Sequence, residues 1–124
     1  MSVFANKIRP HVVRELEQAS ISLNRGEPAL SFKHLENAHV LGQESTYFHV
    51  LTHLHMAAWA IRQKDIRELF GQILRIVGAA MMTAIGQIPI GNTGGSNISP
   101  FKSLPLREEH ERIISKAKNA SSNP

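Results

Sequence analysis

The sequence contains no cysteine, which excludes both disulfide bonds and thiolate metal sites. It also lacks long apolar runs: the longest, from Ile76 to Ile85, is shorter than the roughly 18 residues that a membrane span needs. No apolar signal core precedes the first charged residue, Lys7. We therefore expect a protein that resides in the cytoplasm and does not enter a membrane.

Acidic residues are in the minority, since 14 lysines and arginines face 10 aspartates and glutamates and give a net charge of +4. A basic chain raises the question of nucleic-acid binding. However, the basic residues are scattered singly from Lys7 to Lys118, and few aromatic residues lie between them to stack on bases. This pattern favours an ordinary solvated surface over a nucleic-acid interface.

The 124 residues suffice for one domain with a real core. Apolar residues recur near the 3.6-residue period of an amphipathic helix, and turn signals such as Gly26, Pro28 and Gly42 separate the successive stretches. Ser45 suits the N-cap of the third stretch. We predict helices at about 3–24, 28–41, 45–63 and 65–86.

Residues 87–106 are rich in glycine, asparagine, serine and proline, which long helices and strands do not tolerate. Their apolar residues favour a loop that wraps over the core. A short helix at 107–118 and a disordered polar tail at 119–124 would follow. The predicted fold is an all-α single domain over 1–118: a four-helix up-down array of two helical hairpins, with the loop and the short helix packed over it.

The histidines concentrate in residues 34–59, which hold five of the seven. On a helical wheel, Glu36 and His39 fall on the apolar arc of the second helix. His49 and His53 form an i, i+4 pair on the apolar arc of the third. Ionisable groups at such positions need partners, because their burial alone costs several kcal/mol.

Two consecutive helices joined by a short turn run antiparallel, so these four side chains can converge. They would supply nitrogen and oxygen ligands for one divalent metal ion, either zinc, iron, manganese or nickel. A metal-free polar cluster, in which Glu36 holds one or more histidines, explains the same pattern. Val50 follows His49 and no glutamate lies between the histidines, so this is not the H-E-x-x-H site of metalloproteases. The pattern leaves open whether the protein is an enzyme.

Glu68, Gln72 and Arg75 form a polar stripe on the otherwise apolar fourth helix. If the stripe faces the interior, Glu68 can be a fifth ligand, with Gln72 and Arg75 as partners that orient carboxylates. An exposed stripe with ordinary contacts between helical turns is an equally good interpretation.

The loop contains the segment GNTGG at residues 91–95. Gly94 and Gly95 can direct backbone amides at an anion, whereas a tight turn that needs positive φ explains the glycines at least as well. No strand precedes the segment, and the phosphate-loop pattern is absent. Asn92 can reach the histidine cluster if the loop folds back.

The succession LENAHVLGQ, H-x3-H-x2-M, GQILRI and P-x-GNTGG-x-N-x-S resembles a small bacterial family catalogued as domain of unknown function 3703. The resemblance extends to about Leu106, with Ser103-Leu104-Pro105 standing where the family reads Pro-Met-Pro. It implies a helical single-domain protein and carries no established activity. The candidate residues inside the shared motifs are Glu36, His39, His49, His53, Gln72, Arg75 and Asn92.

Two functions remain open at this point. The first is a cytosolic protein that binds one divalent metal ion through the His/Glu cluster. The second is a helical interaction module with a metal-free cluster, because the pattern A-x6-G-E-x10-A from Ala19 to Ala38 resembles one tetratricopeptide hairpin, although it does not recur at a fixed period. Such a module would bind another protein or a second copy of the chain.

Overall fold

The structure is a computed structural model that describes residues 1–84 and 103–122. Its helices are α1 (Val3–Asn24), α2 (Pro28–Gly42), α3 (Thr46–Gln63), α4 (Ile66–Ala84) and α5 (Glu108–Ser122). No strand occurs in the described residues, and the predicted all-α class is confirmed.

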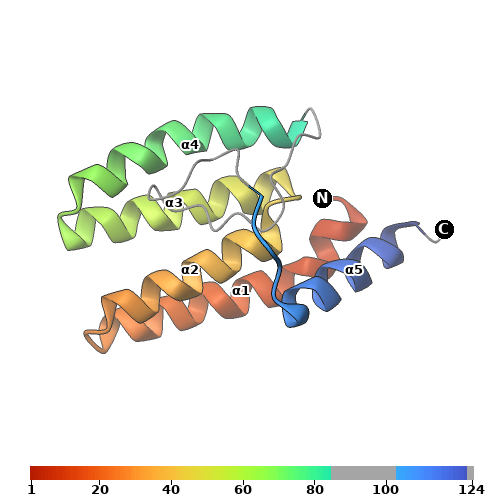
Figure 1. The fold of residues 1–124 in the computed structure, drawn as a ribbon, viewed down its shortest axis with the longest axis horizontal. Helices are drawn as coiled ribbons and strands as arrows, with labels where there is room; N and C mark the ends of the chain where they lie inside the picture. The colour runs from red at the N-terminus through yellow and green to blue at the C-terminus, as the bar shows by residue number, and fades with distance from the viewer. Residues whose placement is uncertain (85–102, 123–124) are drawn as a thin grey trace.

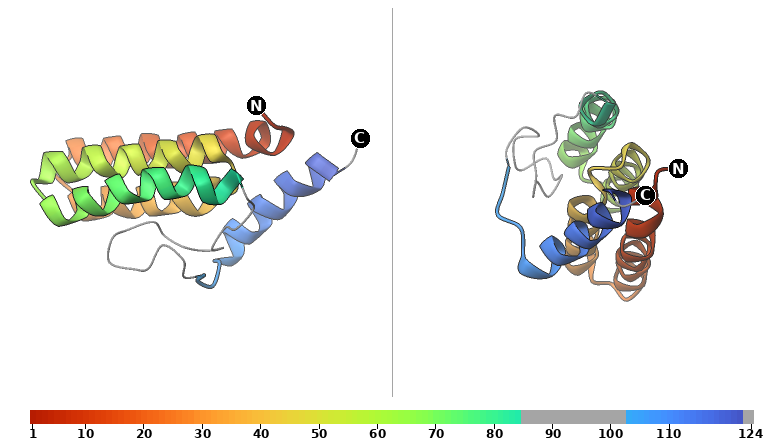
Figure 2. Two further views of the ribbon diagram at one scale, coloured as in Figure 1. Left: turned by 90° about the horizontal axis from the view of Figure 1, so that it is seen from above. Right: turned by 90° about the vertical axis from the view of Figure 1, so that its right-hand side faces the viewer.

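Helices α1 and α2 form one hairpin, α3 and α4 form another, and α2 packs against α3 to join them (Figure 1). Helix α5 crosses the first hairpin near the N-terminus (Figure 2). This arrangement is compatible with the predicted up-down array. None of the helices in the described part of the chain has the length and apolar character that crossing a membrane requires.

The first hairpin follows from local turn chemistry. Helix α1 begins after Ser2, whose hydroxyl accepts a 3.0 Å hydrogen bond from the backbone N–H of Ala5, and it continues through Pro10. Gly26 adopts a φ of +78°, which costs glycine little, and Pro28 then starts α2. The turn therefore uses the residues that the sequence analysis assigned to it.

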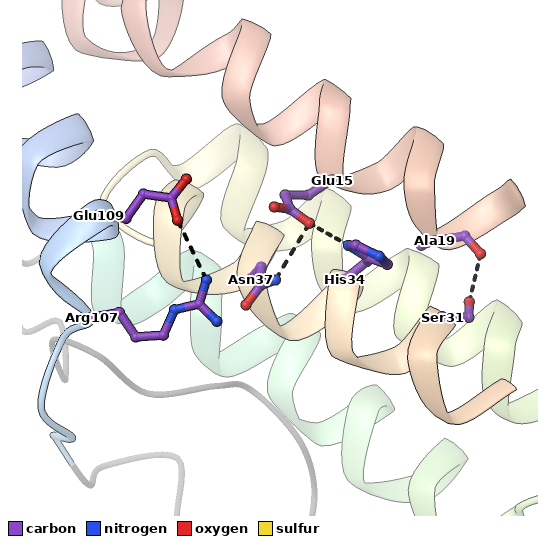
Figure 3. A network of polar contacts seen from close by, with 7 residues as sticks. All are labelled: Glu15, Ala19, Ser31, His34, Asn37, Arg107 and Glu109. Carbon is purple, nitrogen blue, oxygen red and sulfur yellow. Dashed lines mark hydrogen bonds and ion pairs between the residues drawn. The ribbon is translucent and has the colours of Figure 1, made fainter. Parts of the chain in front are cut away.

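Polar side chains fix how α2 lies on α1 (Figure 3). The Ser31 hydroxyl donates a 2.7 Å hydrogen bond to the carbonyl oxygen of Ala19. One carboxylate oxygen of Glu15 lies 2.6 Å from Nδ1 of His34 and accepts a 3.5 Å hydrogen bond from the amide of Asn37. His34 therefore takes part in the contact between α1 and α2 through its interaction with Glu15.

The main core lies where α1, the end of α2, the start of α3 and α5 meet. Its buried apolar residues are Ala5, Ile8, Val12, Ala38, Leu41, Phe48, Ile114 and Ala117. A smaller cluster of Ala19, Leu35 and Met56 continues the core between α1, α2 and α3. Helix α5 is therefore a component of the core, and the main core sits at the same end of the hairpins as the histidines.

Helix α5 continues to Ser122, so residues 119–122 are helical where a disordered tail was expected. Ala117 is buried and Ala120 is half-buried, so the packed face of the helix extends into this segment. Most of the predicted covering loop, residues 87–102, lies outside the described residues, as do 123–124. Residues 103–107 precede α5 without regular secondary structure.

Gly42 ends α2 at its contact with α3, where a Cβ atom would lie 2.8 Å from Cβ of Phe48 and 3.3 Å from Cγ2 of Val12. We expect Gly42→Ala to lower the free energy of unfolding by about 1–3 kcal/mol, as overpacking does. Gly78 in α4 has no atom within 4 Å of such a Cβ, so Gly78→Ala should be neutral or stabilising by up to about 1 kcal/mol. Urea unfolding followed by circular dichroism compares them, and equal losses would contradict the close packing at Gly42.

Candidate metal centre

Three buried histidines meet where the second half of α2 faces the first half of α3. His39 comes from α2, His49 and His53 come from α3, and none is more than 5% exposed. Each offers a ring nitrogen, and these atoms lie within 4.8 Å of one another. In residues 1–84 and 103–122, this is the one group of three or more histidine, aspartate or glutamate side chains with spacing suited to a metal ion.

Helix geometry explains the convergence. His49 and His53 are four residues apart and therefore lie on the same face of α3. His39 lies one turn before the end of α2, and its ring meets both others edge-on, with ring centroids 4.8 Å from His49 and 4.7 Å from His53. Nε2 of His39 lies 3.2 Å from Nε2 of His53. The three imidazole rings are thus in contact with one another at one place between α2 and α3.

Helix α4 supplies the partner that fixes the His53 ring. Nδ1 of His53 lies 2.6 Å from Oε1 of Gln72, and the Gln72 amide nitrogen donates a 2.6 Å hydrogen bond to the Glu68 carboxylate. A carboxylate can only accept, so the amide nitrogen of Gln72 must face Glu68 and its oxygen must face His53. Nδ1 of His53 therefore carries the hydrogen, and in the neutral ring the Nε2 lone pair points toward His39.

Burial keeps the imidazole rings of His49 and His53 neutral at physiological pH. It lowers the pKa of His49 to about 3, with a further contribution from the nearby His53. Burial also lowers the pKa of His53 to about 4; the Gln72 hydrogen bond and Glu68 oppose this effect, and Arg75 adds to it. Neutral imidazole is the form that binds metal ions, so both rings are ready to coordinate without losing a proton.

Glu36 is half-buried on α2, one turn before His39, and it is not part of the group formed by the three histidines. Its assignment as a ligand therefore stays a prediction. His55, which the wheel places away from the cluster, is exposed on α3.

The polar stripe of α4 faces inward. Gln72 is fully buried, Glu68 is 9% exposed and Arg75 is half-buried. Glu68 lies outside the three-histidine group and reaches it through Gln72. Asn92, Gly94 and Gly95 lie outside the described residues.

Gln43 is a buried polar residue that the sequence analysis did not select. It caps the end of α2 one turn after His39, is 2% exposed, and its amide oxygen has no hydrogen-bond partner among the residues that the structure describes. Buried acceptors of this kind are usually satisfied by a water molecule or an ion. The sequence signal that points to Gln43 is its i+4 spacing from His39, which places both side chains on one face of α2.

Acidification should destabilise the metal-free protein. The ordinary histidine pKa is 6.5, whereas His49 and His53 have values of about 3 and 4 in the folded chain. Below pH 6.5 the unfolded chain therefore binds more protons than the folded one, and the free energy of unfolding falls by up to about 1.4 kcal/mol per pH unit for each histidine.

Urea unfolding in the presence of a chelator, between about pH 5 and 7.5, measures this slope. The variant His49→Gln should show a shallower dependence, because one of the two suppressed protonations is gone. A slope that is the same in the variant and the natural chain would contradict the burial of a neutral His49.

Comparison with known proteins places the chain in a family. The model of a family described as a protein of unknown function, DUF3703, matches residues 6–114. That segment includes the three histidines and their partners on α4. No curated protein and no solved structure matches the chain. Because the matched segment covers most of the sequence, this chain belongs to the DUF3703 family.

Proposed function

We propose that this protein binds one divalent transition-metal ion between α2 and α3, with His39, His49 and His53 as ligands. The observation that carries the proposal is the convergence of three buried ring nitrogens within 4.8 Å. Polar groups cost stability when buried, and apolar side chains at these positions would pack without that cost. A metal ion gives the three rings a common partner.

The separation of the ring nitrogens supports this proposal. A tetrahedral ion with metal–nitrogen bonds of about 2.0–2.1 Å holds its ligand nitrogens about 3.3 Å apart. Nε2 of His39 and Nε2 of His53 are already 3.2 Å apart. Because no ligand separation in the group exceeds 4.8 Å, shortening the others by about 1.5 Å at most would complete the site.

The hydrogen bond to His53 also supports it. Histidines that bind metals usually donate their second ring N–H to an acceptor, which fixes the tautomer and the ring orientation. Gln72, held in turn by Glu68, does this for His53 and leaves Nε2 directed at the cluster. This pair would hold the His53 ring in the orientation that metal binding needs.

The ligand set narrows the choice of ion. Imidazole suits zinc, iron(II) and nickel, whereas magnesium, calcium and manganese prefer oxygen ligands. Three histidines leave the fourth tetrahedral position to another group. Closure by Glu36 would favour a structural or sensing ion, and a water molecule there would favour chemistry at the metal.

A metal-free cluster is the second candidate, and the same distance favours it. A separation of 3.2 Å between Nε2 of His39 and Nε2 of His53 also suits one N–H···N hydrogen bond. His39 would be the donor, since Nε2 of His53 carries the lone pair. Donation would then run in one direction from His39 through His53 and Gln72 to Glu68, and the cluster would serve to specify helix packing.

Metal analysis separates the two candidates. Untagged protein that is stripped with a chelator and then supplied with zinc, iron(II), manganese or nickel should retain one equivalent of at least one metal after desalting. His49→Ala and His53→Ala should lose it, because each removes one of three ligands. His55→Ala changes an exposed histidine of the same helix and should retain the metal.

Circular dichroism verifies that each variant is helical, and His49→Gln provides a milder substitution should the alanine variant unfold. Metal content well below one equivalent in the natural chain, with all four metals, would contradict the proposal and favour the metal-free cluster.

Substitution of the surrounding residues tests how the site is held. Gln72→Met keeps the side-chain volume and removes the hydrogen bond to His53, so we expect metal affinity to fall by about 10–100-fold. Glu36→Gln should weaken binding comparably if the carboxylate is the fourth ligand and should leave it unchanged if water holds that position. Competition with a chromophoric chelator measures both. Unchanged affinity in Gln72→Met would contradict its orienting role.

A further inference from the structure

The outer face of α4 exposes large apolar side chains along most of the helix. We name these six residues the α4 stripe. They are Ile66 (66% exposed), Phe70 (65%), Ile73 (50%), Leu74 (77%), Val77 (63%) and Met81 (65%).

The packing of α4 explains why this stripe is uncovered. Among the described helices, α4 packs against α3 alone, and it lies at the edge of the helical bundle (Figure 1). Its inner face carries Glu68 and Gln72, which take part in the histidine cluster. The helix therefore turns Glu68 and Gln72 inward and the apolar α4 stripe outward, which is the reverse of an ordinary surface helix.

The area of the stripe is large for a monomer. Six large apolar residues that are each at least half exposed leave roughly 700 Å² of surface in water, more than the 300–600 Å² of the largest patch on a typical monomer. One partner's share of a standard protein–protein interface is roughly 800 Å². The exposed area of the stripe is thus close to the size of one side of a specific interface.

The spacing of the stripe indicates that its partner is a helix. Ile66, Phe70, Ile73 and Val77 follow one another at intervals of four, three and four residues, which is the alternation of a coiled-coil seam. A helix laid along this seam would fill it with regularly spaced side chains. The chain that follows α4 matches this requirement poorly, since residues 87–106 contain three glycines and three prolines.

We propose that the partner is a second copy of this chain, and that two copies pair through their α4 stripes as a symmetric dimer. A two-fold interface places the same patch on both sides, so each stripe would supply the helix that the other one needs. No charged residue belongs to the stripe, so the pairing brings no like charges into contact. The proposal is independent of metal binding, because the stripe lies on the face of α4 opposite to Gln72, the residue that contacts the histidine cluster.

A membrane surface is the competing partner for an exposed apolar helix face. Helices that lie in a membrane interface carry a strongly charged face rich in lysine and arginine opposite the apolar one. In α4 that position holds Glu68, Gln72 and one arginine, Arg75; all three face the rest of the protein, with Glu68 and Gln72 buried and Arg75 half-buried. The charge pattern therefore favours a protein partner.

Sedimentation equilibrium of the full chain tests the dimer. At about 100 µM the natural chain should have twice the mass of one chain, and dilution should shift it toward the monomer. The variant Leu74→Glu/Val77→Glu should be helical and monomeric at the same concentration, with a dissociation constant raised at least about 100-fold. Ile21→Glu, which changes an exposed isoleucine on α1, should stay dimeric.

Three results would overturn the proposal. The first is a natural chain that is monomeric at about 100 µM. The second is a dimer that persists in the Leu74→Glu/Val77→Glu variant. The third is a monomeric natural chain that sediments with vesicles of phosphatidylcholine and phosphatidylglycerol while the double variant does not, which would assign the stripe to a membrane surface.

Discussion

The contact of three buried imidazoles between α2 and α3 is the constraint on which the rest of the structure depends. Rings at this position cannot reach bulk water, so their polar atoms must be satisfied from inside the protein. Gln72 and Glu68 of α4 do so for His53. The position of α4 on α3 is therefore tied to the chemistry of the cluster as well as to apolar packing.

The same constraint explains the unusual orientation of α4. Glu68 and Gln72 are needed on the inner face, where Gln72 meets His53, and the six apolar residues of the α4 stripe lie on the outer face. A monomer would expose the whole stripe to water. The polar contact of Gln72 with the histidine cluster and the apolar stripe on the surface thus follow from one arrangement of residues along α4.

Much of this fold could be predicted from the sequence, because its turns use residues with strong local preferences. Gly26, Pro28, Gly42 and Ser45 placed the ends of α1 and α2 and the start of α3 within a residue or two of those in the structure. The sequence also selected His39, His49 and His53 from seven histidines, since helical periodicity shows which of them fall on apolar arcs.

Other features depend on contacts that periodicity does not contain. The inward orientation of Gln72 depends on how α4 is rotated against α3. The sequence does not determine this rotation and is equally compatible with an exposed stripe. The position of Glu36 outside the three-histidine group depends on the rotation of α2, which a helical wheel specifies only approximately. The helical segment at 119–122 continues α5, whose residues Ile114 and Ala117 pack into the core, and local composition does not reveal that packing.

X-ray absorption spectroscopy at the metal edge tests the central claim most directly, because it reports the ligands of the ion itself. For protein loaded with one equivalent of zinc, the account predicts three imidazole nitrogens at about 2.0–2.1 Å, with the outer-atom scattering of imidazole rings. A spectrum dominated by oxygen ligands without imidazole scattering would contradict it.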